Sequence, residues 1–262
     1  MKVYGLQFET AWEDKETNFR RTGKLLKELC PGRDSLVVLP EMFSTGFSRN
    51  VRGMAESETG PTAEFVRKLA KAHGVYLVAP FMVEGRSGLG SNEAWFITPE
   101  GEVCLRYSKM HPFRFAGEHL DFQAGQTLGL CTWEGVETHV SICYDLRFPE
   151  MYRQAVFQGA IFHIVPANWP AARSAHWEAL LRARAIENQA YVLGVNRVGS
   201  DPNVSYAGGS LLINPRGEIL DRGTDQEGWI RGEIDVNMVQ GYRKEFPALE
   251  DMRRDFKPPA SS

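Results

Sequence analysis

The stretch Ser141-Ile142-Cys143-Tyr144-Asp145-Leu146-Arg147-Phe148-Pro149-Glu150 places a cysteine at a junction between two kinds of secondary structure. The apolar residues that lead into it, 140–142, are typical of a buried strand. Pro149 suits the first position of a helix, where its missing N–H has no helical partner to lose, and residues 151–156 continue with a helical apolar spacing. The stretch therefore predicts that a strand gives way to a helix at Cys143.

Cys143 has two interpretations at this position. A thiol near the N-terminus of a helix feels positive potential, which favours the thiolate and hence a reactive nucleophile. A free cysteine is also among the most buried residue types, so Cys143 could equally be an inert side chain of the core. Taken alone, the residue fits the core interpretation better, and the rest of the chain decides between the two.

The composition is that of a folded protein with an extensive core. The chain has 262 residues, of which 43% are hydrophobic and 24% are charged, as in ordinary globular domains. A formal net charge of −3 and a pI of about 6.1 predict no nucleic acid and no membrane as partner, and leave a small neutral or anionic substrate. We expect one domain over residues 1–239, followed by a charged, proline-bearing tail over residues 240–262 that packs on a partner subunit or stays loose.

The cysteines and the N-terminus favour a reducing compartment. Cys30, Cys104, Cys131 and Cys143 are widely spaced, without a CxxC pair, which is unlike a disulfide framework. The first ten residues lack an apolar segment of signal-peptide length, and no apolar run is long enough to span a bilayer. We therefore expect a cytoplasmic protein, and the Cys and His residues show no spacing that predicts a metal site.

Strands and helices alternate along the chain. The apolar pattern predicts strands over residues 3–8, 35–39, 75–83, 161–166, 191–195 and 229–234, and helices over residues 14–30, 61–74 and 174–189. The turns Pro99-Glu100-Gly101 and Pro215-Arg216-Gly217 predict two hairpins. Their surroundings, 97–103 and 213–219, resemble each other, which indicates two similar halves or a shared turn solution. Residues 110–125 show no clear period and are predicted to form a functional or mobile loop.

Three polar side chains each follow a predicted apolar strand. Glu41 follows residues 35–39, Lys109 follows residues 103–107, and Cys143 follows residues 138–142. Strand ends are places where side chains from distant parts of a sequence converge. A thiol nucleophile, a carboxylate base and an ammonium group that stabilises an oxyanion form a complete set for acyl transfer. Each charge alone would be an ordinary solvated loop residue, but their common setting favours an active site.

Histidine is the usual partner of a catalytic cysteine, so three histidines are candidate bases. His139 and His163 lie within predicted strands and have the pattern of core residues. His176 lies near the start of a predicted helix, from which it could reach the mouth of a site. No histidine belongs to a motif that marks it as a base.

Three blocks carry a family resemblance: Leu39-Pro40-Glu41-Met42-Phe43, Tyr107-Ser108-Lys109-Met110-His111-Pro112-Phe113, and residues 142–150. In this order they resemble the signature blocks of the nitrilase, or carbon-nitrogen hydrolase, superfamily, and the likeness extends over residues 1–235. The resemblance implies that Glu41 is the general base, Lys109 the oxyanion-stabilising lysine and Cys143 the nucleophile, without metal or organic cofactor. Glu118 matches the family's second glutamate, which helps to hold the lysine and the substrate.

The same resemblance implies a fold and an assembly. The fold is an α/β (α+β) four-layer αββα sandwich, in which two mixed sheets are flanked by helices. Such sandwiches often pair through their helices, so we expect a homodimer or a higher homo-oligomer.

Residues 167–170, 173–177 and 184–189 are similar to the bacterial omega-amidase branch. That likeness implies release of ammonia from the terminal amide of 2-oxoglutaramate or 2-oxosuccinamate through a thioester intermediate. Related branches share much of these segments, so another hydrolase of the superfamily, such as an N-carbamoyl amine hydrolase or a nitrilase, stays open. A non-catalytic dimeric interaction scaffold is the alternative from a different class.

The expected substrate contacts follow from that hypothesis. The far carboxylate of a dicarboxylate monoamide needs a cation, for which Arg173 is the first candidate and Arg147 the second; a salt bridge to Glu150 is the favoured alternative for Arg147. The backbone N–H of Tyr144 is expected to assist Lys109 at the oxyanion. The pocket wall is expected to contain Phe113, Phe115 and Trp169, although ordinary packing would explain these aromatic residues equally well. His176 is expected at the mouth of the pocket.

Overall fold

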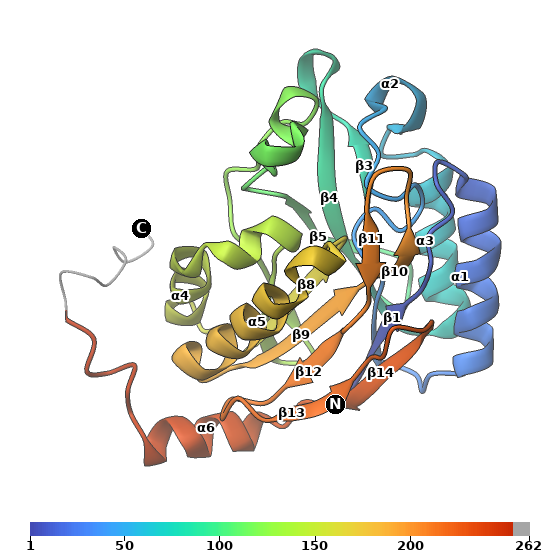
Figure 1. The fold of residues 1–262 in the computed structure, drawn as a ribbon. Coiled ribbons are helices and arrows are strands. Elements are labelled where there is room, and N and C mark those ends of the chain that lie inside the picture. The colour runs from blue at the N-terminus through green and yellow to red at the C-terminus, as the bar shows by residue number, and fades with distance from the viewer. Residues whose placement is uncertain (254–262) are drawn as a thin grey trace.

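Two mixed six-stranded sheets pack face to face at the centre of the computed structural model, which describes residues 1–253 (Figure 1). The first sheet contains, in spatial order, β14 (Gly228–Glu233), β1 (Lys2–Gln7), β2 (Leu36–Val38), β3 (Tyr76–Glu84), β4 (Gly90–Ile97) and β5 (Val103–Ser108). The second contains β13 (Ile219–Arg222), β12 (Leu211–Ile213), β9 (Tyr191–Asn196), β8 (Phe162–Ala167), β7 (Val136–Val140) and β6 (Gly129–Trp133). A separate two-stranded ribbon is formed by β10 (Val198–Ser200) and β11 (Ser205–Ala207).

Helices cover the two outer faces of this pair of sheets. The first sheet is covered by α1 (Lys15–Leu29) and α3 (Pro61–His73), and the second by α4 (Pro149–Phe157) and α5 (Ser174–Asn188) (Figure 1). The remaining helices are α2 (Val51–Met54), α6 (Val236–Glu245) and the 3₁₀ turns η1 (Arg86–Gly88), η2 (Arg114–Ala116), η3 (Glu118–Leu120), η4 (Cys143–Arg147) and η5 (Ala171–Arg173). The predicted four-layer αββα sandwich is confirmed.

The first two long helices begin and end where their local chemistry dictates. The Asp14 side chain accepts a hydrogen bond from the Thr17 N–H at the start of α1, and the helix ends at Cys30 in the left-handed conformation. Pro61 occupies the first turn of α3, and Gly74 ends it with a positive φ. The strands that follow these helices, β2 after α1 and β3 after α3, pair side by side and parallel.

The two sheets repeat one strand arrangement, as the similar hairpins suggested. In each half, three successive strands pair in parallel, and a fourth and a fifth add antiparallel: β1-β2-β3-β4-β5 and β7-β8-β9-β12-β13. Both hairpins carry a register shift before the turn. They also make the same closing hydrogen bonds, from Thr98 to Glu102 and from Asn214 to Glu218. The hairpin likeness therefore reflects two similar halves.

Apolar packing joins the two sheets to each other and to the helices. Apolar side chains fill the space between the sheets, with Val3, Val38 and Val78 from the first sheet and Ile164 and Leu193 from the second all buried. A second apolar cluster joins the outer face of the first sheet to α1 and α3. Because both layers of packing are rigid, side chains that follow the strands have fixed relative positions.

The C-terminal region differs from the prediction at its boundary. Helix α6 runs from Val236 to Glu245, so a boundary after residue 239 falls within a helix. Arg243 donates to the backbone oxygens of Ala160, Asn188 and Gln189, which fixes α6 to the second half. The charged composition of residues 240–245 reflects the solvent face of this helix. Residues 254–262 lie outside the described residues, and contact of the tail with a partner subunit stays a prediction.

Candidate active site

Cys143 lies at a sharp turn between strand and helix. Two extended residues follow β7, and Cys143 then opens η4 with a φ of 47°, a left-handed conformation that is uncommon for a side chain other than glycine. Pro149 begins α4 as predicted. The helix that starts at the cysteine is thus a 3₁₀ turn of five residues, and the regular helix begins six positions later. The thiol is 9% exposed at the floor of a cavity.

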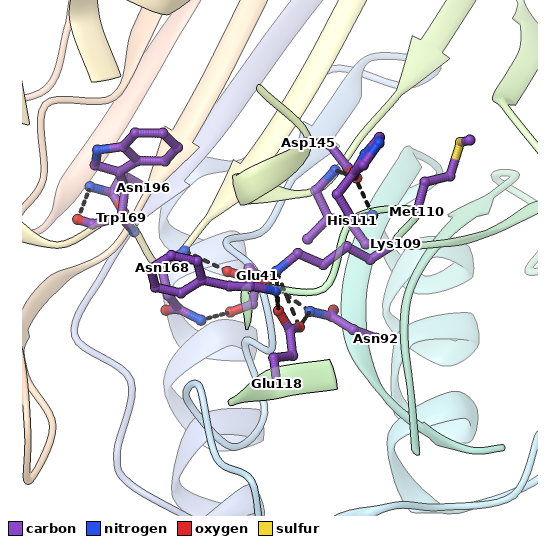
Figure 2. Close-up of polar contacts among 12 residues, drawn as sticks. Glu41, Asn92, Lys109, Met110, His111, Glu118, Asp145, Asn168, Trp169 and Asn196 are labelled. Atoms are coloured by element: carbon purple, nitrogen blue, oxygen red, sulfur yellow. Dashed lines mark hydrogen bonds and ion pairs between the residues drawn. The ribbon is translucent and has the colours of Figure 1, made fainter. Parts of the chain in front are cut away.

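A buried ammonium group lies between two carboxylates beside this thiol. Lys109 Nζ is 2.8 Å from Glu41 Oε1 and 3.0 Å from Glu118 Oε2, and all three side chains are at most 1% exposed (Figure 2). Glu41 follows β2, Lys109 follows β5 and Glu118 comes from η3. The structure therefore brings together the side chains that the sequence placed at separate strand ends, and adds Glu118 as the resemblance implied.

Asn92 completes this cluster and was not predicted. Its Nδ2 donates to Glu41 Oε1 over 2.8 Å and to Glu118 Oε1 over 3.1 Å, and its backbone oxygen accepts from the Lys109 N–H over 2.9 Å (Figure 2). Asn92 lies in the first half of β4, where Ser91, Asn92 and Glu93 break the apolar pattern. The polar run of residues 91–93, ahead of the first predicted hairpin turn, was the only signal for it.

The second oxygen of Glu41 is held by the loop after β8. The Asn168 N–H donates to Glu41 Oε2 over 2.8 Å, and Asn168 Nδ2 donates to the Glu41 backbone oxygen over 2.9 Å. Asn196 in turn bonds both the N–H and the backbone oxygen of Trp169 (Figure 2). Each carboxylate oxygen of Glu41 thus has a fixed donor, so the orientation of the carboxylate is determined by both halves of the fold.

The charges at the site keep the proton on sulfur in the resting protein. Burial and the neighbouring charge of Glu41 raise the pKa of the Cys143 thiol well above its ordinary value, and Lys109 opposes them only in part. Burial disfavours the ammonium of Lys109, but the carboxylates of Glu118 and Glu41 outweigh it and raise the lysine pKa. The expectation that a helix start makes Cys143 a thiolate is therefore wrong, because η4 is short and because burial and the charge of Glu41 outweigh the opposing charge of Lys109.

The cavity above Cys143 has a volume of about 170 Å³. Of the predicted substrate contacts, Phe113, Phe115, Arg147, Trp169 and Arg173 line it, together with Tyr144. Val204 and Tyr206, from the β10–β11 ribbon and its turn, also line it and were not predicted. The two strands of this ribbon, β10 and β11, have only three residues each, which is too few for a periodic apolar signal.

His176 does not line the cavity but contacts a residue that does. Its Nδ1 lies 3.3 Å from Arg147 Nη2. The Arg147 guanidinium also stacks 4.8 Å from the centroid of the Trp169 ring. Within residues 1–253 Arg147 forms no ion pair with Glu150, so the favoured salt-bridge interpretation is wrong: the side chain turns toward the aromatic wall of the cavity.

Arg173 is the second cation of the cavity. Its guanidinium lies 5.5 Å from the centroid of the Phe113 ring and 5.9 Å from that of Phe115. In the described part of the chain, neither Arg173 nor Arg147 has a carboxylate partner. Two guanidinium groups of the same cavity are therefore available to an anionic ligand.

His139 and His163 lie in the core, as their strand positions predicted. Both are fully buried, and their Nδ1 atoms are 3.2 Å apart. Burial lowers the pKa of His139 to about 4, and burial together with His139 lowers the pKa of His163. Neither ring lines the cavity. Across residues 1–253, no group of three or more His, Cys, Asp or Glu side chains is arranged to hold a metal ion.

A thiol and an ammonium group that line a small cavity, with two buried carboxylates paired to the ammonium, define an enzyme site rather than a docking surface. Comparison with known families agrees: residues 3–244 match the carbon-nitrogen hydrolase family. The chain belongs to this family, and it is a hydrolase of carbon–nitrogen bonds. The resemblance noted in the three sequence blocks is confirmed.

Relatives and solved structures extend over nearly the whole chain. The omega-amidase YafV of Escherichia coli K12 is 38% identical over 96% of both chains. The 2-oxoglutaramate amidase of Bacillus subtilis is 35% identical over 95% of this chain and 96% of its own. A Xanthomonas campestris CN-hydrolase superfamily protein with an arsenic adduct in its active site has a TM-score of 0.91, at 35% identity over 97% of both chains. Saccharomyces cerevisiae Nit3, of the nitrilase superfamily, has a TM-score of 0.86 at 25% identity, over 97% of this chain and 96% of its own.

No helix of the described residues has both the length and the apolar character required to cross a membrane.

Proposed function

We propose that the protein is an omega-amidase, which releases ammonia from the terminal amide of a small dicarboxylic acid monoamide such as 2-oxoglutaramate or 2-oxosuccinamate. The observation that carries this proposal is the pair of guanidinium groups, Arg147 and Arg173, in the same cavity as Cys143 and without carboxylate partners in the described chain. A carboxylate bound by an arginine gains charge-assisted, often bidentate hydrogen bonds. The names of the relatives from Escherichia coli and Bacillus subtilis point to the same substrates.

In the proposed first stage, Cys143 Sγ attacks the amide carbon while Glu41 accepts the thiol proton. The negative charge of the tetrahedral intermediate is stabilised by Lys109 Nζ and by the Tyr144 N–H. Glu41 passes the proton to the departing ammonia, and a thioester remains on Cys143. In the second stage Glu41 activates a water molecule, which releases the acid and restores the thiol.

Charge balance supports Glu41 as the base. The resting cluster of Glu41, Glu118 and Lys109 carries two negative charges and one positive charge, next to a neutral thiol. A thiolate formed by loss of the proton to solvent would add a further buried negative charge. Transfer of the proton to Glu41 leaves the total charge unchanged. The second carboxylate, Glu118, keeps Lys109 protonated while Glu41 is neutral.

Ammonia release from a matched panel of compounds tests the proposal. The panel contains 2-oxoglutaramate, 2-oxosuccinamate, a neutral amide of the same length, an N-carbamoyl amine and a nitrile. We expect turnover of the two omega-amides and loss of it in a folded Cys143→Ala variant. Normal ammonia release by that variant would contradict the assignment of the nucleophile. Preferred turnover of the carbamoyl compound or the nitrile would identify a different hydrolase of the superfamily, and no turnover at all would favour the interaction scaffold.

The role of Glu41 is tested by mass spectrometry of the intact protein. A Glu41→Gln variant should show no acyl adduct after incubation with substrate, because its thiol cannot lose its proton. A stable adduct in this variant would restrict Glu41 to the second stage.

We also propose a cytoplasmic homodimer or higher homo-oligomer. Large apolar side chains stay exposed on the half of the fold that carries α5 and α6: Ile186 is 48%, Leu220 47% and Phe246 58% exposed. A partner subunit would remove this apolar surface from water. Light scattering during gel filtration measures the mass, and a monomer would contradict this proposal.

A further inference from the structure

Asp145 joins the turn that carries the thiol to the segment that carries the lysine. Its carboxylate is fully buried two residues after Cys143, yet the proposed reaction gives it no chemical task. We infer that Asp145 is a positioning residue, which fixes the Lys109 ammonium relative to the Cys143 sulfur. This inference rests on the proposed function and adds a residue to it.

Both oxygens of Asp145 accept hydrogen bonds. Oδ2 accepts from the Ile142 N–H over 3.0 Å and from the Tyr107 hydroxyl over 2.6 Å. Oδ1 lies 2.9 Å from the His111 N–H and 2.8 Å from His111 Nδ1, contacts that Figure 2 shows beside Lys109. The Tyr107 hydroxyl also accepts from the Met110 N–H over 3.2 Å. One carboxylate thus holds the residue before Cys143 and residues on both sides of Lys109.

These bonds cross between the two halves of the fold. Tyr107 and His111 lie two positions before and after Lys109, at the end of β5 in the first sheet. Cys143 and Asp145 follow β7 in the second sheet. No chain connection shorter than residues 109–143 links the lysine to the cysteine, so their separation depends on contacts such as these. Asp145 bonds both segments directly.

The Tyr107 hydroxyl is suited to stay a donor. Burial raises the pKa of its phenol well above the ordinary value, and the charge of Asp145 adds to this. The bond is therefore present throughout the pH range of an assay. An oxyanion-stabilising group that shifts by about 1 Å loses on the order of a hundredfold in rate. Loss of the Tyr107 bond should consequently affect the step that needs the lysine.

Two reactions of Cys143 distinguish an effect on the position of Lys109 from an effect on the turn that carries the thiol. Amide hydrolysis needs proton transfer and oxyanion stabilisation. Methylthiolation by methyl methanethiosulfonate needs only the first: the thiol proton passes to Glu41, a sulfur–sulfur bond forms, and methanesulfinate leaves. Modification of the peptide that contains Cys143 is measured by mass spectrometry, which distinguishes it from the other cysteines.

The variants are Tyr107→Phe and Asp145→Asn, with Tyr152→Phe as the matched control. The Tyr152 hydroxyl is equally buried and bonds Ser141 Oγ over 2.6 Å, but it does not contact the lysine segment. We expect kcat to fall about tenfold or more in both test variants, with KM and the methylthiolation rate within about threefold of wild type. The control should keep kcat within about threefold. Circular dichroism verifies that each variant is folded. If Asp145→Asn does not fold, the result for Tyr107→Phe alone tests the inference.

Two results would overturn the positioning role. An unchanged kcat in Tyr107→Phe would show that the lysine needs no such support. An equal fall of hydrolysis and methylthiolation would show that Asp145 maintains only the cysteine turn. Absence of hydrolysis by the wild-type protein contradicts the proposed function instead, so the two failures are distinct.

Discussion

Asn92 shows how a neutral side chain controls charged ones. Its amide donates to Glu41 and Glu118 at once, so it shares with Lys109 the task of holding two carboxylates close together. Without it, Oε1 of each carboxylate would be left with the Lys109 ammonium as its partner. An amide fits this place because it adds donors without adding charge.

An Asn92→Asp variant should lose activity about 10- to 100-fold and become less stable as the pH rises. The new acid would face two carboxylates, so its pKa in the folded protein would lie above the unfolded value of about 3.9. A raised folded-state pKa means that stability is retained below the unfolded pKa and is lost as the pH rises through the folded pKa. Melting temperatures at about pH 5 and about pH 8, relative to wild type, measure this. An Asn92→Ala variant serves as control, because its difference from wild type should not vary with pH.

The buried side chains of His139 and His163 determine how the stability of the fold should change in acid. Burial lowers the pKa of His139 to about 4, whereas the unfolded chain takes up the proton near 6.5. The folded state therefore binds fewer protons below this pH, and stability falls as the pH decreases from about 6.5 to about 4. His139 alone accounts for about 3 kcal/mol over that range, and His163 adds to it in the same direction.

The measurement is the free energy of unfolding in urea across this pH range. A His163→Gln variant should show a shallower loss toward acid, and His176→Gln, at an exposed position, should keep the wild-type slope. Equal slopes in all three proteins would contradict a neutral buried pair.

At the scale of elements, α6 holds together the C-terminal ends of α4 and α5 in the second half. Arg243 donates to the backbone oxygens that end α5 and follow α4, and Gln189 Nε2 returns a bond to the Phe246 oxygen. Terminal carbonyl groups of a helix have no partner within the helix. The Arg243 guanidinium of α6 donates to these carbonyl groups, and its positive charge interacts favourably with the negative end of the helix dipole.

An Arg243→Ala variant should therefore lose about 1.5–3 kcal/mol of unfolding free energy without a change of kcat. For a domain of this size the melting temperature falls by about 2–4 °C per kcal/mol. Lys244→Ala, at the exposed neighbouring position, should melt like the wild type. A reduced kcat in folded Arg243→Ala would connect α6 to the active site, against this expectation.

The sequence predicted the elements with a simple apolar pattern and the residues that follow them. Glu41, Lys109 and Cys143 could be found because each follows an apolar strand and lies in a block that resembles a signature block of the family. Asn92 could not, because its partners come from other segments and it interrupts the apolar pattern of its own strand. The β10–β11 ribbon lacked a signal because its strands have three residues each. The proton on Cys143 depends on the spatial neighbour Glu41, which local sequence does not reveal.

At the scale of the whole molecule, the site depends on how the two sheets face each other. Glu41 and Lys109 follow strands of the first sheet, and Cys143 follows a strand of the second. The halves repeat the same strand arrangement, and β1 of the first sheet approaches β9 of the second. Gly5 in β1 lets this happen, because a Cβ there would lie 2.7 Å from Val195 Cγ2 and 2.9 Å from Ile230 Cγ1.

A pair of glycine substitutions with opposite effects tests this dependence. Gly5→Ala would push a methyl group between the sheets and should lower the unfolding free energy by about 1–3 kcal/mol. Gly23→Ala lies in α1 with no atom within 4 Å of the new Cβ, so it should raise stability by about 0.5–1 kcal/mol. Since Val195 and the Cys143 strand belong to the same sheet, Gly5→Ala should also lower kcat by about threefold or more where both variants are folded. Urea unfolding and amide hydrolysis supply the two readouts. A stable, fully active Gly5→Ala protein would mean that the sheets can separate by the width of a methyl group without moving the thiol away from Glu41 and Lys109.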